Sequence, residues 1–471
     1  MRGQRIGWAC LLLFGVTGCA SVDLRAGFPD VSAAVEERYA TKIVWNRGTD
    51  LDREAAEKLR SLLQRKLTAN DAVQIAMLNN RDLQAVYSEL GVAQADLVQA
   101  GLFRNPILDA AVLFPLSGVR PDLQLSVVIS FLDALYVPLR KRVAAARFEE
   151  AKLRVTGAVL DFAVQVRAAF YGHQANEQTL ELRRSIVQAL TSSFDVSRRL
   201  HEAGNITDLD LARDRALMEG SKLALRSAEV GARQSREQLN SLMGAWGEDT
   251  KWEIDGRLPE VPSEPLLMDG IEQVALTRSI DLSNARQRII VAGQQLGYDR
   301  ATALIPATDL GLGADREEGW KVGPVLSVPI PLFDQGQARI GRAVAELRRA
   351  QQEYYALAVR IRAVVRAVEE RLRGAQDRAL YYRDILLPLR ERIVNEAQLQ
   401  YNAMQIGVVQ LLRDRELQIE TGVAYVEALR EYWLARADLV QISSGRLPVA
   451  NGFRVDGMDA KTKTKEGRNG D

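Results

Sequence analysis

A short stretch of this sequence occurs twice, and each copy lies between two long, charged segments that favour helix. The first copy covers residues 201–215 and the second covers 401–415. Both contain the triplet Arg-Asp-Arg, which begins at positions 213 and 413, an offset of 413 − 213 = 200 residues. Gly204 and Gly407 interrupt the helical pattern inside the two copies. Each copy is therefore predicted to be the turn of a helical hairpin.

The composition excludes several classes of function. The chain has 471 residues and a formal net charge of +1, with 26% charged residues. A nucleic-acid-binding protein would carry a basic face, so this near-neutral chain is not expected to bind nucleic acid. Histidine occurs only as His173 and His201, which disfavours a histidine-based metal site or catalytic triad. We therefore predict no catalytic residues, no metal site and no cofactor.

The N-terminus has the features of a secreted lipoprotein precursor. A short basic start precedes an apolar run that is too short to span a bilayer as a stable helix. The run ends in Val-Thr-Gly-Cys at 16–19, which resembles the lipobox of bacterial lipoproteins. We predict a signal peptide over 1–18 and lipid attachment at Cys19; the alternative is an ordinary signal peptide with an incidental cysteine. The mature chain would then have a single cysteine and no intramolecular disulfide.

The rest of the chain is predicted to contain two repeats with the same order of elements. Thr68 and Asp71 resemble a helix capping box at the start of the first repeat. Pro106 and Pro306 stop the first helix of each repeat, and short apolar runs of strand length follow. The predicted segments are an N-terminal periplasmic segment over 19–66, repeat 1 over 67–244, a linker over 245–266, repeat 2 over 267–445 and a disordered tail over 446–471.

Each repeat is predicted to be helix, β-hairpin, long helix, turn and helix. In repeat 1 the segments are a helix from 68 to about 104, a β-hairpin over 107–131, a long helix to about 203, a turn over 204–207 and a helix to 243. In repeat 2 they are a helix over 268–304, a β-hairpin over 308–331, a long helix over 335–404, a turn over 404–408 and a helix to 444. Pro388 is expected to kink the second long helix. A heptad of apolar positions from Ile340 to Leu372 predicts left-handed supercoiled packing along that helix.

The number of strands has a physical consequence for assembly. One chain supplies four strands, which cannot close a barrel, and open strand edges are not tolerated in a bilayer. Three chains would supply about twelve strands, within the range of transmembrane barrels. The fold class predicted is therefore mainly α with a small membrane β part. Its coiled-coil hairpins would form a periplasmic α-barrel, and its four strands would join a trimeric, 12-stranded β-barrel.

The sequence resembles the TolC-like outer-membrane factors of Gram-negative efflux systems. The resemblance covers about 67–445 and depends on the duplicated plan and on the turn motif. The first copy matches the motif at Gly204, Ile206, Asp210, Leu211, Ala212 and Arg213, and the second matches at Tyr401, Leu411 and Leu412. The second copy departs at Met404, which replaces the usual glycine and moves the expected break to Gly407. It also departs at Arg413, where the family often has aspartate.

The resemblance implies an outer-membrane channel that is not an enzyme. The chain would be a lipid-anchored homotrimer in contact with outer-membrane lipids and would extend into the periplasm. It would receive substrate from an inner-membrane pump through a periplasmic adaptor (membrane fusion) protein. Two groups of residues would serve this role. The adaptor-contact tips are Gly204, Asn205, Ile206, Thr207, Gln405, Ile406, Gly407 and Val408, and the periplasmic gate is Asp210, Tyr401, Gln410, Arg413 and Asp414.

Two other interpretations fit parts of the sequence. A lipid-anchored periplasmic coiled-coil adaptor or scaffold would share the heptads and the anchor, but it would not need one pair of strands in each repeat. An enzyme would use His201, Asp208 and Asp210 for acid–base chemistry, although charges in turns and at helix ends are common. The sequence does not select a substrate among drugs, metal ions and other compounds.

Overall fold

The structure is a computed structural model that describes residues 21–48, 50–114, 121–130, 132–264, 270–304, 308–316 and 319–448. The predicted signal peptide and Cys19 lie outside these residues. So do 115–120, between the first two strands, Pro306, and 449–471 of the predicted tail.

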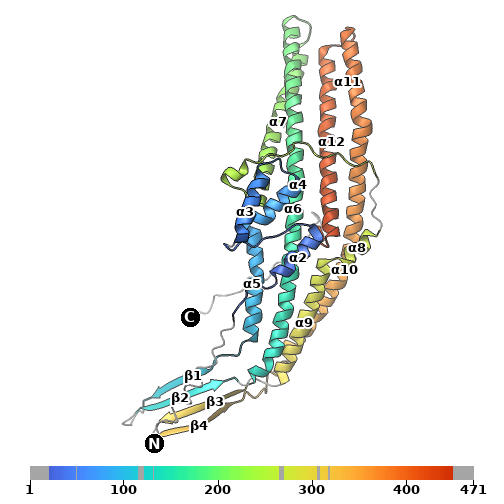
Figure 1. Ribbon diagram of the computed structural model, residues 1–471. Coiled ribbons are helices and arrows are strands. Elements are labelled where there is room, and N and C mark those ends of the chain that lie inside the picture. The colour runs from blue at the N-terminus through green and yellow to red at the C-terminus, as the bar shows by residue number, and fades with distance from the viewer. Residues whose placement is uncertain are drawn as a thin grey trace. The chain divides into compact units, whose positions relative to one another are not determined.

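The order of elements repeats as predicted (Figure 1). Repeat 1 contains α4 (Ala69–Asn79), α5 (Arg81–Gly101), β1 (Ile107–Leu113), β2 (Asp122–Ile129), α6 (Asp133–Glu202) and α7 (Asp208–Met243). Repeat 2 contains α8 (Ile271–Thr277), α9 (Ile280–Leu304), β3 (Asp309–Arg316), β4 (Trp320–Ser327), α10 (Gln337–Tyr381), a π-helical turn η2 (Tyr382–Leu386), α11 (Leu387–Asn402) and α12 (Val408–Ser443). Outside the repeats lie α2 (Phe28–Tyr39), α3 (Asp50–Leu63) and the 3₁₀ turn η1 (Gly247–Thr250).

The first helix of each repeat is broken, where the sequence predicted one continuous helix. The Thr68–Asp71 capping box is present at the start of α4 and confirms the predicted start. Asn80 then ends α4 with an extended backbone, and its buried side chain donates to the Leu242 carbonyl at the end of α7. In repeat 2, the Ile280 amide donates to the carbonyl of Gly445, which follows α12. In both repeats, a residue at the break donates a hydrogen bond to a carbonyl at or just past the end of a distant helix.

The second long helix is irregular near the predicted kink. The π-helical turn η2 lies between α10 and α11 without a break in the helix, and Pro388, which has no backbone N–H to donate, is the second residue of α11. The Arg383 side chain in η2 donates to the Val261 carbonyl and to Ser263. The apolar stripe of the predicted heptad is buried at Ile361, Val365, Val368 and Leu372.

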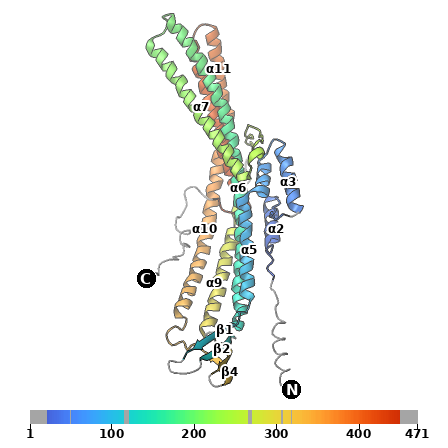
Figure 2. The same ribbon diagram turned by 90° about the vertical axis from the view of Figure 1, so that its left-hand side faces the viewer.

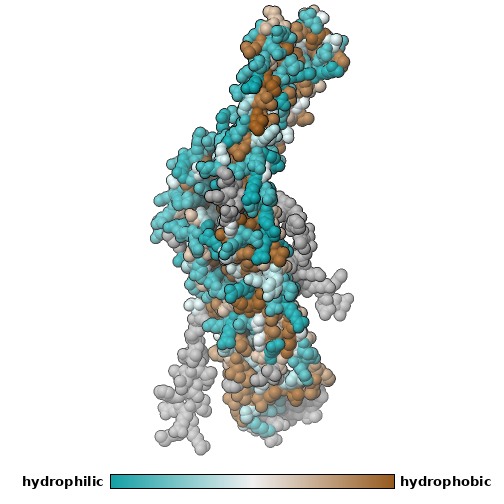
Figure 3. Space-filling model, turned by 90° about the vertical axis from the view of Figure 1, so that its right-hand side faces the viewer, coloured by the Kyte–Doolittle hydropathy of each residue, from teal (hydrophilic) through white to brown (hydrophobic). Residues whose placement is uncertain are grey.

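The four strands form one antiparallel sheet in the order β1-β2-β3-β4 (Figure 1). Gly311 faces Val128 across the β2–β3 pair, and a Cβ at Gly311 would lie 2.4 Å from the Val127 oxygen. Glycine is therefore required at this register position. Large apolar side chains on the sheet are exposed, among them Leu108, Leu312, Val322 and Leu326 at 63–71%. Figure 3 shows apolar side chains gathered over this end of the molecule.

The chain divides into two compact units, and each takes segments from both repeats. The first unit holds the described residues up to 45, 81–158 and 282–357, and it contains the sheet and one end of each long helix. The second holds 46–80, 159–281 and the described residues from 358 on, and it contains both turns. The ring of Phe28 packs on those of Trp45 and Tyr87 in the first unit, with centroids 5.5 and 5.2 Å apart.

In the second unit the residues between the repeats run over the helices and are fixed by glutamines. Gln174 of α6 donates to the carbonyls of Asp255 and Arg257, and Gln376 of α10 donates to those of Pro262 and Glu264. Both glutamines are buried, at 5% and 6% exposure. The predicted linker is therefore a packed strap over the helices of the second unit.

The predicted disordered tail began too early. Arg446 forms ion pairs with Asp161 of α6 and Asp281 of α9, and the amide of Leu447 donates to Asp281. Charge pairs in the second unit therefore fix the chain just past α12.

Candidate functional site

The first turn, between α6 and α7, matches the prediction from its glycine. Gly204 has a φ of +77°, and the amides of Gly204 and Asn205 donate to the carbonyls of His201 and Leu200, both at 2.8 Å. Thr207 caps α7, because its Oγ1 accepts a hydrogen bond from the Asp210 amide at 3.2 Å. Its hydroxyl also donates to the Asp210 carboxylate at 2.8 Å. Glycine and a side-chain cap together make a well-defined turn.

The second turn, between α11 and α12, repeats these bonds with different residues. The amides of Met404 and Gln405 donate to the carbonyls of Tyr401 and Gln400, both at 2.9 Å. Met404 itself has a φ of +58°, so the expected break at Gly407 is wrong. Gly407 instead stands at the N-cap with φ −80° and ψ 159°, nearly the angles of Thr207, and offers no capping side chain. Backbone bonds preserved between the copies therefore hold a non-glycine residue in the left-handed region.

Most of the predicted tip residues are exposed. Gly204, Asn205, Thr207, Gln405 and Gly407 are exposed. The half-buried residues are Ile206, Ile406 and Val408. Each turn therefore half-buries its isoleucine and exposes glycine and polar side chains. The Met404 side chain, which the tip prediction omitted, is 94% exposed.

The predicted gate residues are close to the turns, and most of their contacts stay within one helix. Asp210 lies 3.6 Å from Arg213 of its own helix, not beside Arg413. Arg413 of α12 has its nitrogen 3.8 Å from a carboxylate oxygen of Asp214 on α7. Gln410 donates to Asp414 one helical turn away, at 3.3 Å. Tyr401 is 40% exposed.

Asp214 is the site residue that the sequence analysis missed. It is 8% exposed and accepts a 2.5 Å hydrogen bond from the Ser197 hydroxyl of α6, so it joins three helices. The Arg-Asp-Arg triplet was the available signal, since Asp214 is its central residue in the first copy. Burial places Asp214 between the two hairpins and leaves Asp210 on the surface.

Farther from the turns, more contacts link the two hairpins. Arg183 of α6 pairs with Glu420 of α12. Ile419 packs against the buried cluster of Ile186, Leu190 and Met218. Burial, and then the Glu420 carboxylate, raise the pKa of Glu416, while Arg413 lowers it. Figures 1 and 2 show α7 beside α6 and α12 beside α11 along this part of the second unit.

The acid–base residues of the alternative interpretation form a surface pair. His201 Nε2 lies 2.7 Å from Asp208 Oδ1, and the Asp208 side chain is 97% exposed. Asp208 belongs to the first turn of α7, where a negative charge favours the helix N-terminus. The pair therefore has a structural explanation at the turn.

The described residues contain neither a cluster of metal ligands nor a membrane-spanning helix. Within the ranges given above, no group of three or more His, Cys, Asp or Glu side chains is arranged to hold a metal ion. Across the same ranges, no helix combines the length and the apolar character needed to cross a membrane.

Known proteins share both the sequence pattern and the fold. The cobalt-zinc-cadmium resistance protein CzcC of Cupriavidus metallidurans is 22% identical over 385 residues, which cover 80% of this chain and 90% of CzcC. No protein-family model matches the chain. A crystal structure of CusC superposes with a TM-score of 0.64 at 14% identity, covering 81% of this chain and 92% of CusC. The CmeC outer-membrane channel of Campylobacter jejuni gives 0.64 at 14% identity, over 87% and 92%.

In sequence pattern and in fold, the chain is similar to TolC-like outer-membrane efflux factors. The same order of elements occurs twice in this chain, and the relatives match most of its length. The mainly helical fold with its small four-stranded sheet is confirmed.

Proposed function

We propose that this chain is the outer-membrane exit duct of a tripartite efflux system and that it works as a homotrimer. The observation that carries this proposal is the four-stranded sheet attached to two helical hairpins. Its outer strands β1 and β4 each have one neighbour within the described chain. An apolar sheet with two unpaired edges needs further strands before it can be stable in a bilayer. Three copies would supply 3 × 4 = 12 strands and close a barrel.

The remaining parts of the chain have matching roles in this proposal. Lipid on Cys19 would anchor the protein, and the helical hairpins would extend the duct into the periplasm. The tips at 204–207 and 405–408 would meet a periplasmic adaptor coupled to an inner-membrane pump. Exposed glycine and small polar groups allow a partner hairpin to approach the backbone closely.

We also propose that the residues beyond the turns hold the periplasmic end closed. The predicted group is Asp210, Tyr401, Gln410, Arg413 and Asp414, and Asp214 joins it because it lies between the hairpins. Arg413→Gln would remove the ion pair with Asp214 and is expected to raise single-channel conductance in planar bilayers. Conductance equal to wild type would exclude Arg413 from the closed state.

Assembly and transport can be tested together in cells. Cross-linking in isolated outer membranes should stop at three protomers. A strain lacking the gene should accumulate substrate, and the first ions to test are cobalt, zinc and cadmium, because the relative CzcC is named for resistance to them. Fatty-acid labelling should mark the wild type and not Cys19→Ser. A stable monomer in mild detergent with normal strand content would contradict the proposal.

Adaptor docking has its own test at the second turn. A side chain at Gly407 would meet no atom within 4 Å of its Cβ, so Gly407→Glu starts into open space in the isolated fold. We expect this variant to lose efflux while its trimer level and membrane insertion stay normal. Gly256→Glu is a matched control in the strap, where a side chain also meets no atom within 4 Å. Equal efflux in the two variants would remove Gly407 from the docking surface.

A further inference from the structure

A cavity of about 550 Å³ lies between α5, α6 and α9 in the first unit. Its lining includes Arg104, Arg140 and Arg147, against the single carboxylate of Asp96 among the described lining residues. Apolar groups line the same cavity, among them Phe103, which is 71% exposed. Positively charged and apolar side chains therefore line the same cavity.

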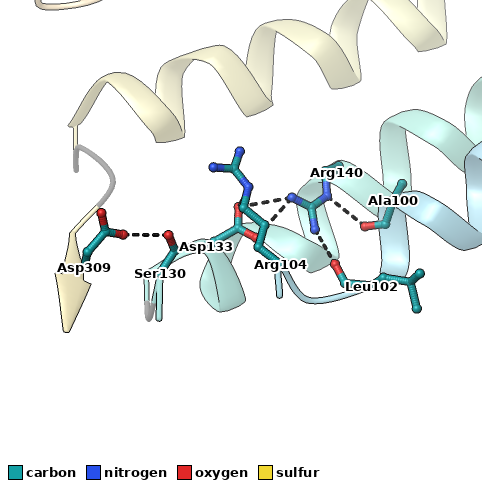
Figure 4. A network of polar contacts seen from close by, with 7 residues as sticks. All are labelled: Ala100, Leu102, Arg104, Ser130, Asp133, Arg140 and Asp309. Atoms are coloured by element: carbon teal, nitrogen blue, oxygen red, sulfur yellow. Dashed lines mark hydrogen bonds and ion pairs between the residues drawn. The ribbon is translucent and has the colours of Figure 1, made fainter. Parts of the chain in front are cut away.

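One of the three arginines donates hydrogen bonds within the protein from all three of its nitrogens. Arg140 donates to the carbonyls of Ala100 and Leu102, at 2.9 and 2.7 Å, and to both oxygens of Asp133, at 3.1 and 3.2 Å (Figure 4). Asp133 is 7% exposed, so Arg140 neutralises a buried charge and satisfies the end of α5. Arg140 therefore holds the wall of the cavity in place.

The other two arginines keep most of their donors available. The Arg104 side chain is 64% exposed, and its Nε lies 3.6 Å from a carboxylate oxygen of Asp133. Its terminal nitrogens point away from the Asp133 carboxylate in Figure 4. Arg147 is exposed and donates one hydrogen bond, to Gln295 at 3.1 Å. A guanidinium has five N–H donors, so both side chains can bind an anion as well.

The cavity also lies at the level of the strand ends. Arg104 is three residues before β1, and Arg140 is seven residues after the first residue of α6, about 10 Å at 1.5 Å per residue. Exposed apolar side chains continue past the strands, at Phe103 and, after β4, at Phe333. If the strands cross the outer membrane, the arginines stand at the depth of the lipid headgroups beneath it.

We propose that this cavity binds the headgroup phosphate of an anionic phospholipid in the periplasmic leaflet. The phosphate would accept hydrogen bonds from Arg104 and Arg147, and the acyl chains would lie along Phe103 toward the strands. This inference depends on the proposed membrane insertion of the sheet. Inorganic phosphate has no apolar part that could contact the apolar side chains beside the arginines. A phospholipid has both a phosphate and acyl chains, so the cavity favours a lipid over a soluble anion.

The test compares the double variant Arg104→Gln, Arg147→Gln with the control Arg339→Gln, Arg348→Gln. Both remove two positive charges from the first unit, and neither control residue lines the cavity. Binding of short-chain phosphatidylglycerol to the full-length trimer in neutral detergent is measured by native mass spectrometry. Each basic residue contributes about 1 kcal/mol to binding an anionic lipid, so the first variant should lose about 2 kcal/mol. Because about 1.4 kcal/mol is a tenfold factor in affinity, this variant should bind about 30-fold more weakly than wild type.

The control should bind phosphatidylglycerol like the wild type, and phosphatidylcholine should bind weakly to all three proteins. Equal loss in both variants would mean diffuse charge attraction and would overturn the site. Displacement of the lipid by millimolar inorganic phosphate would overturn the lipid assignment. The lipid site and the channel are tested by different measurements. The Arg104, Arg147 variant should show normal conductance in planar bilayers even when it has lost lipid binding. The channel proposal fails only if the wild type forms no trimeric pore.

Discussion

The two turns offer a reciprocal exchange of one residue. Gly204 and Met404 stand at equivalent positions, with φ values of +77° and +58° and the same pair of turn hydrogen bonds. A left-handed conformation costs a non-glycine residue about 1–2 kcal/mol. Replacing Met404 with glycine removes this cost, but the greater backbone freedom of glycine in the unfolded chain offsets part of the stabilisation. We therefore expect Met404→Gly to stabilise the second turn by about 1 kcal/mol.

The reverse change should weaken the first turn by a similar amount. A side chain at Gly204 meets no atom within 4 Å, so Gly204→Met adds backbone strain without a steric clash. The Met404 side chain is 94% exposed, so its removal deletes no packing. The exchange therefore isolates the cost of the backbone conformation.

Hydrogen exchange of the turn amides in the detergent-solubilised protein measures the effect. A change of 1 kcal/mol in local opening is about a fivefold change in exchange rate, from the thermal energy scale. The amides of Met404 and Gln405 should exchange about fivefold more slowly in Met404→Gly, and those of Gly204 and Asn205 faster in Gly204→Met. Unchanged or faster exchange in Met404→Gly, with normal helix content, would refute the reasoning.

Three further predictions concern the interior. Burial, and then Arg236, lower the pKa of His173 from 6.5 to about 4, so the unfolded state binds more protons and stability falls as the pH drops from about 6.5 to 4. Between pH 7 and pH 4 this group should lower the unfolding free energy of the wild type by about 3 kcal/mol. In His173→Gln the difference in unfolding free energy between the two pH values, measured by chemical denaturation, should be smaller by that amount. Gly311→Val should abolish trimers on native gels, because its Cβ would lie 2.4 Å from a backbone oxygen of β2, whereas Gly323→Val on β4 meets no atom within 4 Å and should assemble. Arg446→Ala removes the cation beside the half-buried Asp281 and should lower the unfolding free energy by about 2 kcal/mol. The same denaturation assay measures this change, and an unchanged unfolding midpoint would contradict it.

Local interactions along the chain were sufficient to predict most of the elements. Thr68 caps α4 through Asp71, only three residues away, and the heptad between Ile340 and Leu372 recurs every three or four residues. The offset of 200 residues between the two turns predicted the repeated plan. Caps, periodicity and duplication depend on near neighbours or on simple repetition, so the sequence alone determined the order of the helices and strands and the position of both turns.

Tertiary contacts decided where those local rules fail. Asn80 breaks a helix because its amide binds a carbonyl 162 residues away. Met404 adopts a left-handed backbone because the turn bonds between α11 and α12 enforce it, although glycine would be favoured. Arg413 pairs with Asp214 because burial places that carboxylate, and not Asp210, between the hairpins. Each outcome depends on which distant groups meet after packing, and neither propensity nor periodicity carries that information.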